Sequence, residues 1–477
     1  MNTARLPCLR PKSFRQWLPR KDCYNGNHLM PFSAPPAKDG LKHLMRLLSA
    51  RMPLPITRAG EILPRALRSW PEALKKTRGA PETLSSEPLS LEDVLTIPTP
   101  ETNAEDEACD RAIAEGQFLA RQEDWERIEA EILAADTARR ATPGGTPIAD
   151  LIAYGARADI INAVEHALSE GLSLTERVTL DGIMALERTR LECARTPVMT
   201  TVVALAHLDI AWAFRRISKR KSHRQRDTLH ARAEAHHARA KTLLSQIPND
   251  ARARPFVAAA RCALYSVEAS AGCRQIADDY FDLIRLDPGN PRHLRALGTH
   301  LAEQGAEGLR ALELEARRVA ALVQAQWGAA GYAWVYFDAV AQSDAACLEV
   351  DVPYFLDGVA DIVARAANQE RINLLSAYCS IALKPQPETA ADAAAVRQQI
   401  AQAAHWLIRE HLRELHPMVW AHAAAGFDND AQVRSLRQFA ERGRMDALRA
   451  IAESFRDDIE AGYRVVFTAD GPELTAG

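Results

Sequence analysis

The chain has 477 residues, about two to three times the length of a typical domain, so a single small module is excluded. Hydrophobic residues make up 47% and charged residues 25%, with 23 glycines and 26 prolines, which excludes collagen-like, mucin-like and wholly disordered chains. The formal net charge of −3 gives by itself no reason to expect a polyanionic partner.

Residues 1–100 stand apart because they contain 14 of the 26 prolines and no sustained periodicity. This predicts an extended, mostly disordered arm. Residues 1–80 carry 16 Lys and Arg against 4 Asp and Glu, a net of +12, which leaves −15 for the rest of the chain. The near-neutral total is therefore the sum of a basic arm and an acidic body. The alternative is a start at a later methionine, Met30, Met45 or Met52, which would make part of the arm non-native.

From Glu101 onward nearly every stretch follows the helical period and is rich in Ala, Leu, Arg and Glu, so an all-α body is predicted. Proline and glycine breaks divide it into pieces of roughly 30 to 60 residues, which suits helical hairpins. The breaks are residues 142–147 (TPGGTP), Pro197, residues 248–255, residues 287–291 (DPGNP) and residues 385–387 (PQP).

Three regions are predicted: the arm (1–100), a helical-hairpin body (101–385) and a C-terminal helical segment (386–477). The last of these ends with the β-like run Tyr463–Thr468 (YRVVFT), which predicts a short hairpin arm or a frayed end.

Residues 255–325 repeat a pattern of large and small side chains over two successive helix-turn-helix units. Pro288 closes the first unit, and the first helix of the next carries Leu294, Leu297, Gly298 and Leu301; the packing positions of the preceding unit are Ile276, Tyr280 and Leu283, with Ala260 and Ala263 as its small residues. A small residue lets two helices approach closely, while the large ones fill the groove of the neighbouring hairpin.

This pattern resembles tetratricopeptide repeats, whose unit is roughly 34 residues long. The resemblance covers about residues 255–325 and implies a helical-hairpin array or α-solenoid. The run from Trp327 to Trp334 is loosely similar to bacterial helical domains of unknown function, a resemblance that implies no activity.

The segment Arg215–Lys241 holds ten Lys and Arg against Asp227 and Glu234. On a helix its His223, His230 and His237 would share one face. One hypothesis is that it docks a polyanion such as nucleic acid in a salt-dependent manner. The contact candidates are Lys219, Arg220, Lys221, Arg224 and Arg226. The alternative is a solvated helix, or a basic seam against the acidic segment Glu101–Glu107.

Five aromatic residues lie within eleven positions: Trp327, Tyr332, Trp334, Tyr336 and Phe337. Two interpretations stay open for this cluster. The rings pack as a core between hairpins, or Trp327, Tyr332, Trp334 and Tyr336 line a groove that receives a partner segment, since such rings dominate interface energetics.

His405, His411, His416 and His422 are the candidate metal ligands, with His405 and His416 on one helical face and His411 and His422 on another. Zinc enzymes with helical ligands use two histidines four residues apart with a Glu between them, and this spacing is absent. Pro417 also interrupts the helix, so hydrogen-bonded or solvated histidines are predicted rather than a metal site.

Eight cysteines form no CxxC pair, which predicts scattered, reduced thiols. Cys193, Cys262, Cys347 and Cys379 fall in apolar helical stretches, where a free Cys behaves as a small hydrophobe. The window Val319–Phe337 has the length of a membrane span, but glutamines and glycines in its middle favour a buried helix and turn.

No phosphate-binding loop, dinucleotide fingerprint, nucleophile elbow or HExxH motif is present, so no cofactor is expected and an enzyme is not favoured. The arm lacks the apolar run of a secretory signal, which predicts a cytoplasmic location. The leading hypothesis is a bacterial helical-repeat scaffold or adaptor that binds protein partners. The alternatives are a nucleic-acid-binding helical protein, which would use the arm and residues 215–241, and an all-α enzyme or a metal-binding or small-ligand protein.

Overall fold

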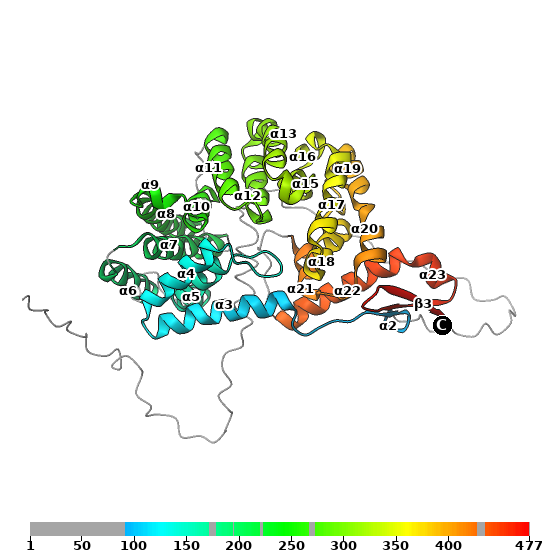
Figure 1. Cartoon of the computed structure of the whole chain (residues 1–477), viewed down its shortest axis with the longest axis horizontal. Coiled ribbons are helices and arrows are strands. Elements are labelled where there is room, and N and C mark those ends of the chain that lie inside the picture. The colour runs from blue at the N-terminus through cyan, green and yellow to red at the C-terminus, as the bar shows by residue number, and fades with distance from the viewer. Residues whose placement is uncertain are drawn as a thin grey trace, which may run out of the picture. The chain divides into compact units, whose positions relative to one another are not determined.

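The computed structural model describes residues 91–170, 178–193, 195–219, 223–266, 272–426 and 435–476, all within one compact unit, Ala37–Gly477. Helices make up most of the described chain, which confirms the all-α fold (Figure 1). Most of the arm for which the sequence predicts disorder, residues 1–90, lies outside the described residues.

The helices of the first half are α2 (Leu91–Val94), α3 (Ala104–Arg121), α4 (Trp125–Thr137), α5 (Ile148–Ser169), α6 (Val178–Glu192), α7 (Pro197–Ser218), α8 (His223–Ser245), α9 (Asn249–Arg252) and α10 (Pro255–Cys262). Those of the second half are α11 (Cys273–Leu286), α12 (Pro291–Ala302), α13 (Gly305–Leu322), α14 (Gln324–Trp327), α15 (Ala330–Gln342), α16 (Asp344–Glu349), α17 (Val352–Ala366), α18 (Gln369–Ala377), α19 (Ala391–Ala401), α20 (Ala403–Trp406), α21 (Pro417–Ala425), α22 (Leu436–Ser454) and α23 (Arg456–Glu460).

All five predicted breaks interrupt the helices. Proline stands in the first turn of α7, α10, α12 and α21, where its fixed φ suits the helix and its missing N–H is not needed. Side chains of Asn103, Thr196 and Asn368 cap α3, α7 and α18 by accepting a hydrogen bond from the first turn. The sequence therefore determines these boundaries locally.

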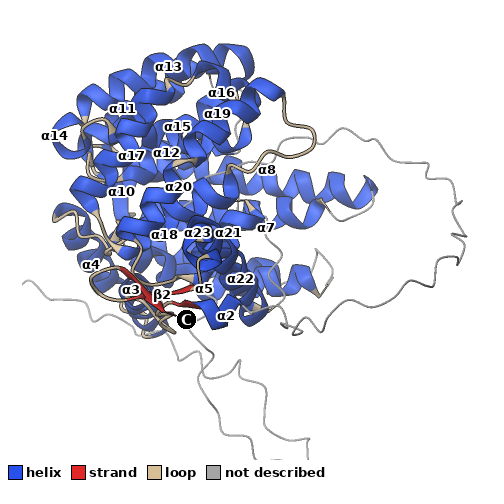
Figure 2. Ribbon diagram, turned by 90° about the vertical axis from the view of Figure 1, so that its right-hand side faces the viewer, coloured by secondary structure: helices blue, strands red, loops and turns tan. Residues whose placement is uncertain are grey.

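The strand-like run is confirmed as a hairpin, in which β2 (Tyr463–Phe467) pairs antiparallel with β3 (Pro472–Ala476). The strand β1 (Leu95–Thr96) adds to it in parallel, with Leu95 opposite Val465 (Figure 2). Residues 91–100, which the sequence analysis places in the arm, thus contain a short helix and a short strand. A strand needs a partner, and this one lies at the other end of the sequence, which local pattern cannot reveal.

Two hydrophobic clusters fill the described chain. One runs from Cys109 to Ala260 and the other joins Leu95 to residues between Cys262 and Phe467. They meet at α10, so the packing changes near residue 260 and continues without interruption across the predicted boundary at 385.

The region that resembles tetratricopeptide repeats forms α11, α12 and α13. Leu294, Leu297 and Leu301 are fully buried, as the pattern predicts. A Cβ on Gly298 would stand 1.7 Å from the carbonyl oxygen of Val335, so the glycine allows α12 to approach α15 closely. The close approach is to α15 rather than to the neighbouring α13, and the solenoid arrangement stays a prediction.

The helix α7 is long and apolar enough to cross a membrane, but 78% of its most apolar stretch is buried inside the protein, as in a core helix. The window Val319–Phe337 forms the predicted buried helix and turn. Gly328, with φ 58°, makes the turn between α14 and α15, and α15 is buried along nearly its whole length.

Candidate functional site

The aromatic cluster is core. Trp327, Tyr332, Trp334 and Tyr336 are 4%, 0%, 1% and 0% exposed, so they offer no surface to a partner and the groove interpretation is wrong. Trp334 meets Trp327 edge to face, at 6.1 Å between ring centroids. The hydroxyls of Tyr332 and Tyr336 both donate to Glu313, at 2.7 and 2.8 Å. Large aromatic rings each bury much apolar area, so a run of them on one helix favours an interior position.

The basic segment ends α7 and forms α8. Among the candidate contacts, Lys219 and Arg226 are exposed, Arg224 lies in the first turn of α8, and Arg220 and Lys221 lie outside the described residues.

Other cations of this segment pair within the fold. Arg216 contacts Glu165 at 2.9 Å, and Arg239 donates to both oxygens of Glu187. The acidic partners of these two arginines thus lie on α5 and α6.

The four C-terminal histidines do not converge. A π-helical turn at Leu407–His411 ends the helix, and residues 412–416 are not helical, so the predicted faces are not kept. His405 is exposed, His411 packs edge-on against Trp406, and His422 lies against Phe439. Burial lowers the pKa of His422 to about 4.

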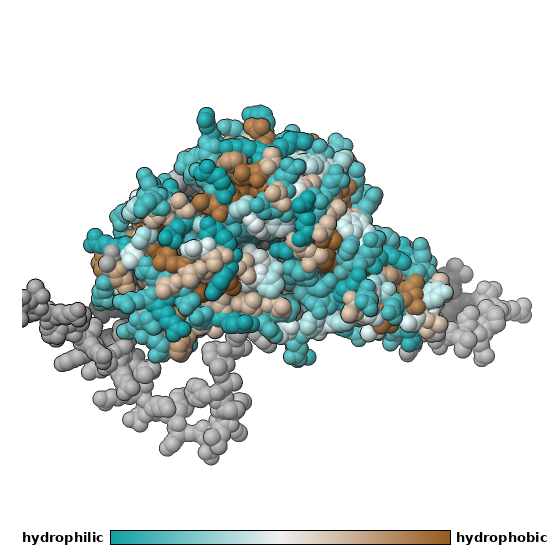
Figure 3. Space-filling model, in the orientation of Figure 1, coloured by the Kyte–Doolittle hydropathy of each residue, from teal (hydrophilic) through white to brown (hydrophobic). Residues whose placement is uncertain are grey.

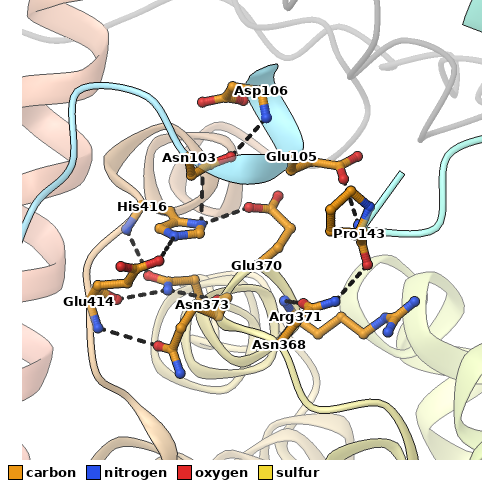
Figure 4. A network of polar contacts seen from close by, with 12 residues as sticks. Asn103, Glu105, Asp106, Pro143, Asn368, Glu370, Arg371, Asn373, Glu414 and His416 are labelled. Carbon is orange, nitrogen blue, oxygen red and sulfur yellow. Dashed lines mark hydrogen bonds and ion pairs between the residues drawn. The ribbon is translucent and has the colours of Figure 1, made fainter. Parts of the chain in front are cut away.

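His416 instead lies at the centre of a partly buried polar cluster, which we call the polar junction: Asn103, Asp106, Glu370, Asn373, Glu414 and His416 (Figure 4). His416 Nδ1 lies 2.7 Å from Glu370 and Nε2 lies 3.0 Å from Glu414. Burial alone would lower the pKa of His416, but these two carboxylates outweigh it and raise the pKa above its ordinary value. Burial, helped by the charge of Glu370, raises the pKa of Asp106 to about 6.

Asn373 completes the polar junction. Its amide donates to the carbonyls of Gln369 and Glu414, and its oxygen accepts from the His416 backbone and the Trp420 indole, all within 2.9 Å. The cluster therefore ties the start of α3 to α18 and α21.

Beside the polar junction, Glu105 fixes the loop between α4 and α5. Its carboxylate accepts hydrogen bonds from Thr142 Oγ1 at 2.7 Å, from the Gly144 backbone and from Thr146 Oγ1. From the other side, the Asn368 amide donates to the Pro143 carbonyl at 2.6 Å (Figure 4). The TPGGTP loop thus has one defined conformation.

The opposite face of this loop lines a cavity of about 300 Å³, which we call the Asp150 pocket. Its walls come from the ends of α4 and α11, the starts of α5, α10 and α12, and the two loops between them. The lining residues include Ala135, Asp136, Arg139, Arg140, Gly145, Ala149, Asp150, Phe256, Ala259, Asp287, Asn290 and His293.

The inner wall of the Asp150 pocket is acidic. Asp136 accepts from the Phe256 backbone at 2.9 Å, and Asp287 accepts from the Asn290 amide at 3.1 Å. Asp150 lies 3.6 Å from Arg292, beyond hydrogen-bond length, and its pKa is raised by burial.

The rim of the Asp150 pocket is basic, because Arg139 and Arg140 are exposed there. Arg139 donates to the last carbonyl of α11, on Leu286, and to the Asp136 carbonyl. No hydrogen bond or ion pair of the Arg140 side chain is found among the described residues. The pocket therefore has three carboxylates in its wall and two exposed guanidinium groups at its rim.

The sequence pattern singled out both loops that form the Asp150 pocket, TPGGTP and DPGNP, but only as helix breaks. The polar residues of the pocket lie at or beside these breaks. Asp136 and Asp150 flank the first break, Asp287 begins the second, and His293 follows it. The sequence offered one signal for the pocket, an acidic residue at or beside each break. Whether these residues come together depends on how four helices pack.

On the face drawn in Figure 3, apolar side chains gather in small separate patches within a mostly hydrophilic surface. Within the described chain, no group of three or more His, Cys, Asp or Glu side chains is arranged to hold a metal ion. The six cysteines that the structure describes are free thiols, and Cys262, Cys347 and Cys379 are buried as predicted.

No protein-family model matches the chain, and comparison with curated proteins and with solved structures found no match either.

Proposed function

We propose that this protein is a cytoplasmic helical scaffold that binds a segment of another protein, and that the Asp150 pocket anchors the segment. The observation that carries the proposal is the cavity of about 300 Å³ at the meeting of five helix ends. It has the size for one amino-acid side chain, apolar walls for its stem and a few polar groups for its tip, which is the usual composition of a binding site.

The surroundings of the pocket support binding rather than catalysis. Asp136 and Asp287 both make hydrogen bonds that hold helix starts in place. Among the described residues, the pocket lining contains no serine, threonine or cysteine that a base could activate as a nucleophile. The wall is also fixed in advance, since Glu105 holds the TPGGTP loop, and a preformed wall lowers the entropic cost of binding.

The test fills the pocket. Ala259→Trp places an indole in the cavity, whereas Ala395→Trp, at an exposed position of α19, is the matched control. Proteins captured from the native cell by the full chain are identified, purified and titrated. We expect the pocket variant to bind the partner at least about 10-fold more weakly, with the control unchanged. Equal affinity of both variants at unchanged melting temperature would contradict the proposal.

A second function is carried by the exposed Lys219 and Arg226 at the α7–α8 end, namely polyanion binding. Phosphate contacts release counterions, so affinity for a duplex oligonucleotide would fall steeply with salt. Titration of the full chain between about 50 and 200 mM salt tests it. Lys219→Glu with Arg226→Glu would weaken binding, and Lys384→Glu, a charge reversal at an exposed position in the loop before α19, is the control; binding that does not depend on salt would exclude this function.

A further inference from the structure

We propose that the Asp150 pocket takes a lysine side chain from the partner segment, with the ammonium group held among Asp136, Asp150 and Asp287. This inference rests on the proposed scaffold function and adds the chemistry of the residue that is recognised.

Asp150 gives the first argument. Its side chain is 20% exposed and forms an ion pair with Arg292 at 3.6 Å, but no hydrogen bond to its carboxylate is found among the described residues. A largely buried carboxylate that accepts no hydrogen bond is costly, because the ion pair replaces only part of the hydration that it has lost. A cationic donor inside the pocket would supply the missing hydrogen bonds.

The other two carboxylates leave one oxygen each for a ligand. Asp136 uses Oδ1 for the Phe256 backbone, and Asp287 uses Oδ2 for the amide of Asn290. The charge of Asp287 raises the pKa of Asp150, and that of Asp150 raises the pKa of Asp136, so the three lie within electrostatic reach of one another. A lysine ammonium carries three donors and no acceptor, which matches three carboxylates on different sides.

The cations already present favour a basic rather than an acidic ligand. Nε and Nη1 of Arg139 donate to backbone carbonyls, Arg292 pairs with Asp150, and His293 lies 3.4 Å from Asp287. Arg140 lies exposed at the rim. The apolar walls formed by Ala135 and Phe256 suit the methylene stem of a lysine, and Arg140 suits an acidic residue next to that lysine in the partner.

The experiment titrates the full chain, labelled at alanine methyl groups, with N-acetyl-lysine amide and follows the signals of Ala135, Ala149 and Ala259, which line the pocket. N-acetyl-norleucine amide has the same stem without the charge, and N-acetyl-glutamate amide has the opposite charge. We expect saturable shifts of the three methyl signals with the lysine probe alone.

Asp150→Asn is expected to weaken the lysine probe at least about 10-fold, while Asp392→Asn, at an exposed position of α19, leaves it unchanged. Equal binding of the norleucine or glutamate probe would overturn the inference, as would an Asp150→Asn variant with wild-type affinity.

The scaffold function and the lysine inference fail separately. If Ala259→Trp loses the partner but Asp150→Asn binds it with unchanged affinity, the scaffold stands and the lysine inference falls. If the lysine probe binds at the pocket but the partner binds Ala259→Trp normally, the site is real and the proposed scaffold function falls.

Discussion

The aromatic core of α15 is fully buried and the polar junction is partly buried, and different forces hold the two regions together. In α15, Trp334 packs on Phe337 at 5.3 Å between centroids, and Phe337 stacks on Tyr378 at 3.9 Å. In the polar junction, every contact is a hydrogen bond or ion pair, and its histidine lies 313 positions from Asn103. Apolar packing depends on volume and tolerates pH, whereas a buried polar cluster depends on each partner and on each proton.

The largest effect is expected from Trp334→Ala in the aromatic core, because the change removes a fully buried ring and leaves a cavity. The free energy of unfolding should fall by about 3–5 kcal/mol in a denaturant titration. Trp334→Phe should cost less, because the indole N–H has no hydrogen-bond partner to lose. Phe118→Ala, at a ring that is 60% exposed, is the control and should change stability by no more than about 0.5 kcal/mol. An equally small loss of stability for Trp334→Ala would contradict the placement of Trp334 in the core.

Asn373→Ala tests the polar junction. It orphans the His416 backbone N–H and the Trp420 indole N–H, both of which donate to Asn373. Each unsatisfied buried donor costs about 1–3 kcal/mol, so a loss of about 2–4 kcal/mol is expected. Hydrogen exchange should rise in residues 412–420 before it rises in α15. Uniform opening of both regions would show that they are one cooperative unit.

A pH titration distinguishes the aromatic core from the polar junction, with a smaller expected effect on stability. Asp106 and His416 both have raised pKa values in the folded chain, Asp106 from 3.8 to about 6 and His416 from 6.5 upward. The folded state therefore binds these protons more tightly than the unfolded state. The contribution of Asp106 is complete below pH 3.8 and is lost as the pH rises through about 6. That of His416 is complete below pH 6.5 and is lost above it.

The melting temperature of the wild type should therefore fall with rising pH more steeply than that of the double variant Asp106→Asn with His416→Gln. Asp106→Asn alone should match the wild type near pH 4 and exceed it near pH 8, where the ionised carboxylate faces Glu370. Trp334→Phe, in the aromatic core, should keep the wild-type slope. Parallel slopes for wild type and double variant would refute a titrating junction.

The smallest effect is expected at the surface pair of Arg121 and Asp159, which joins α3 to α5 at 2.7 Å with both side chains about half exposed. Solvent screens such pairs, so Arg121→Ala should cost less than about 1 kcal/mol, and less still at high salt. Comparing this cost with that of Asn373→Ala shows how much a polar contact gains in stability when it is buried. A cost similar to that of Asn373→Ala would contradict this contrast.

Much of the fold could be predicted from local sequence. Helical periodicity gave the all-α class, prolines at 197, 255 and 291 marked helix starts, and YRVVFT marked the hairpin. These signals act within one turn of helix or one strand. The aromatic run of α15 is similar, because its own composition forces it inside, although the sequence alone left open whether its rings were core or groove.

The candidate site could not be predicted in the same way. The Asp150 pocket and the polar junction consist of ordinary Asp, Glu, Asn and His residues that are far apart in the chain, and none forms a motif. His416 is typical of this, since the sequence predicted hydrogen-bonded or solvated histidines in its segment but not the two carboxylates that it meets. A polar side chain reveals its role only through its partners.

The sequence by itself thus determined which segments are helical and where they end, because hydrophobic period, caps and breakers act over a few residues. Tertiary structure alone decided which helix ends meet. The charge asymmetry shows the same division. Counting residues established that the body is acidic, but only packing placed Asp150 beside a cavity and His416 between two carboxylates. Burial there changes the pKa values of ordinary side chains.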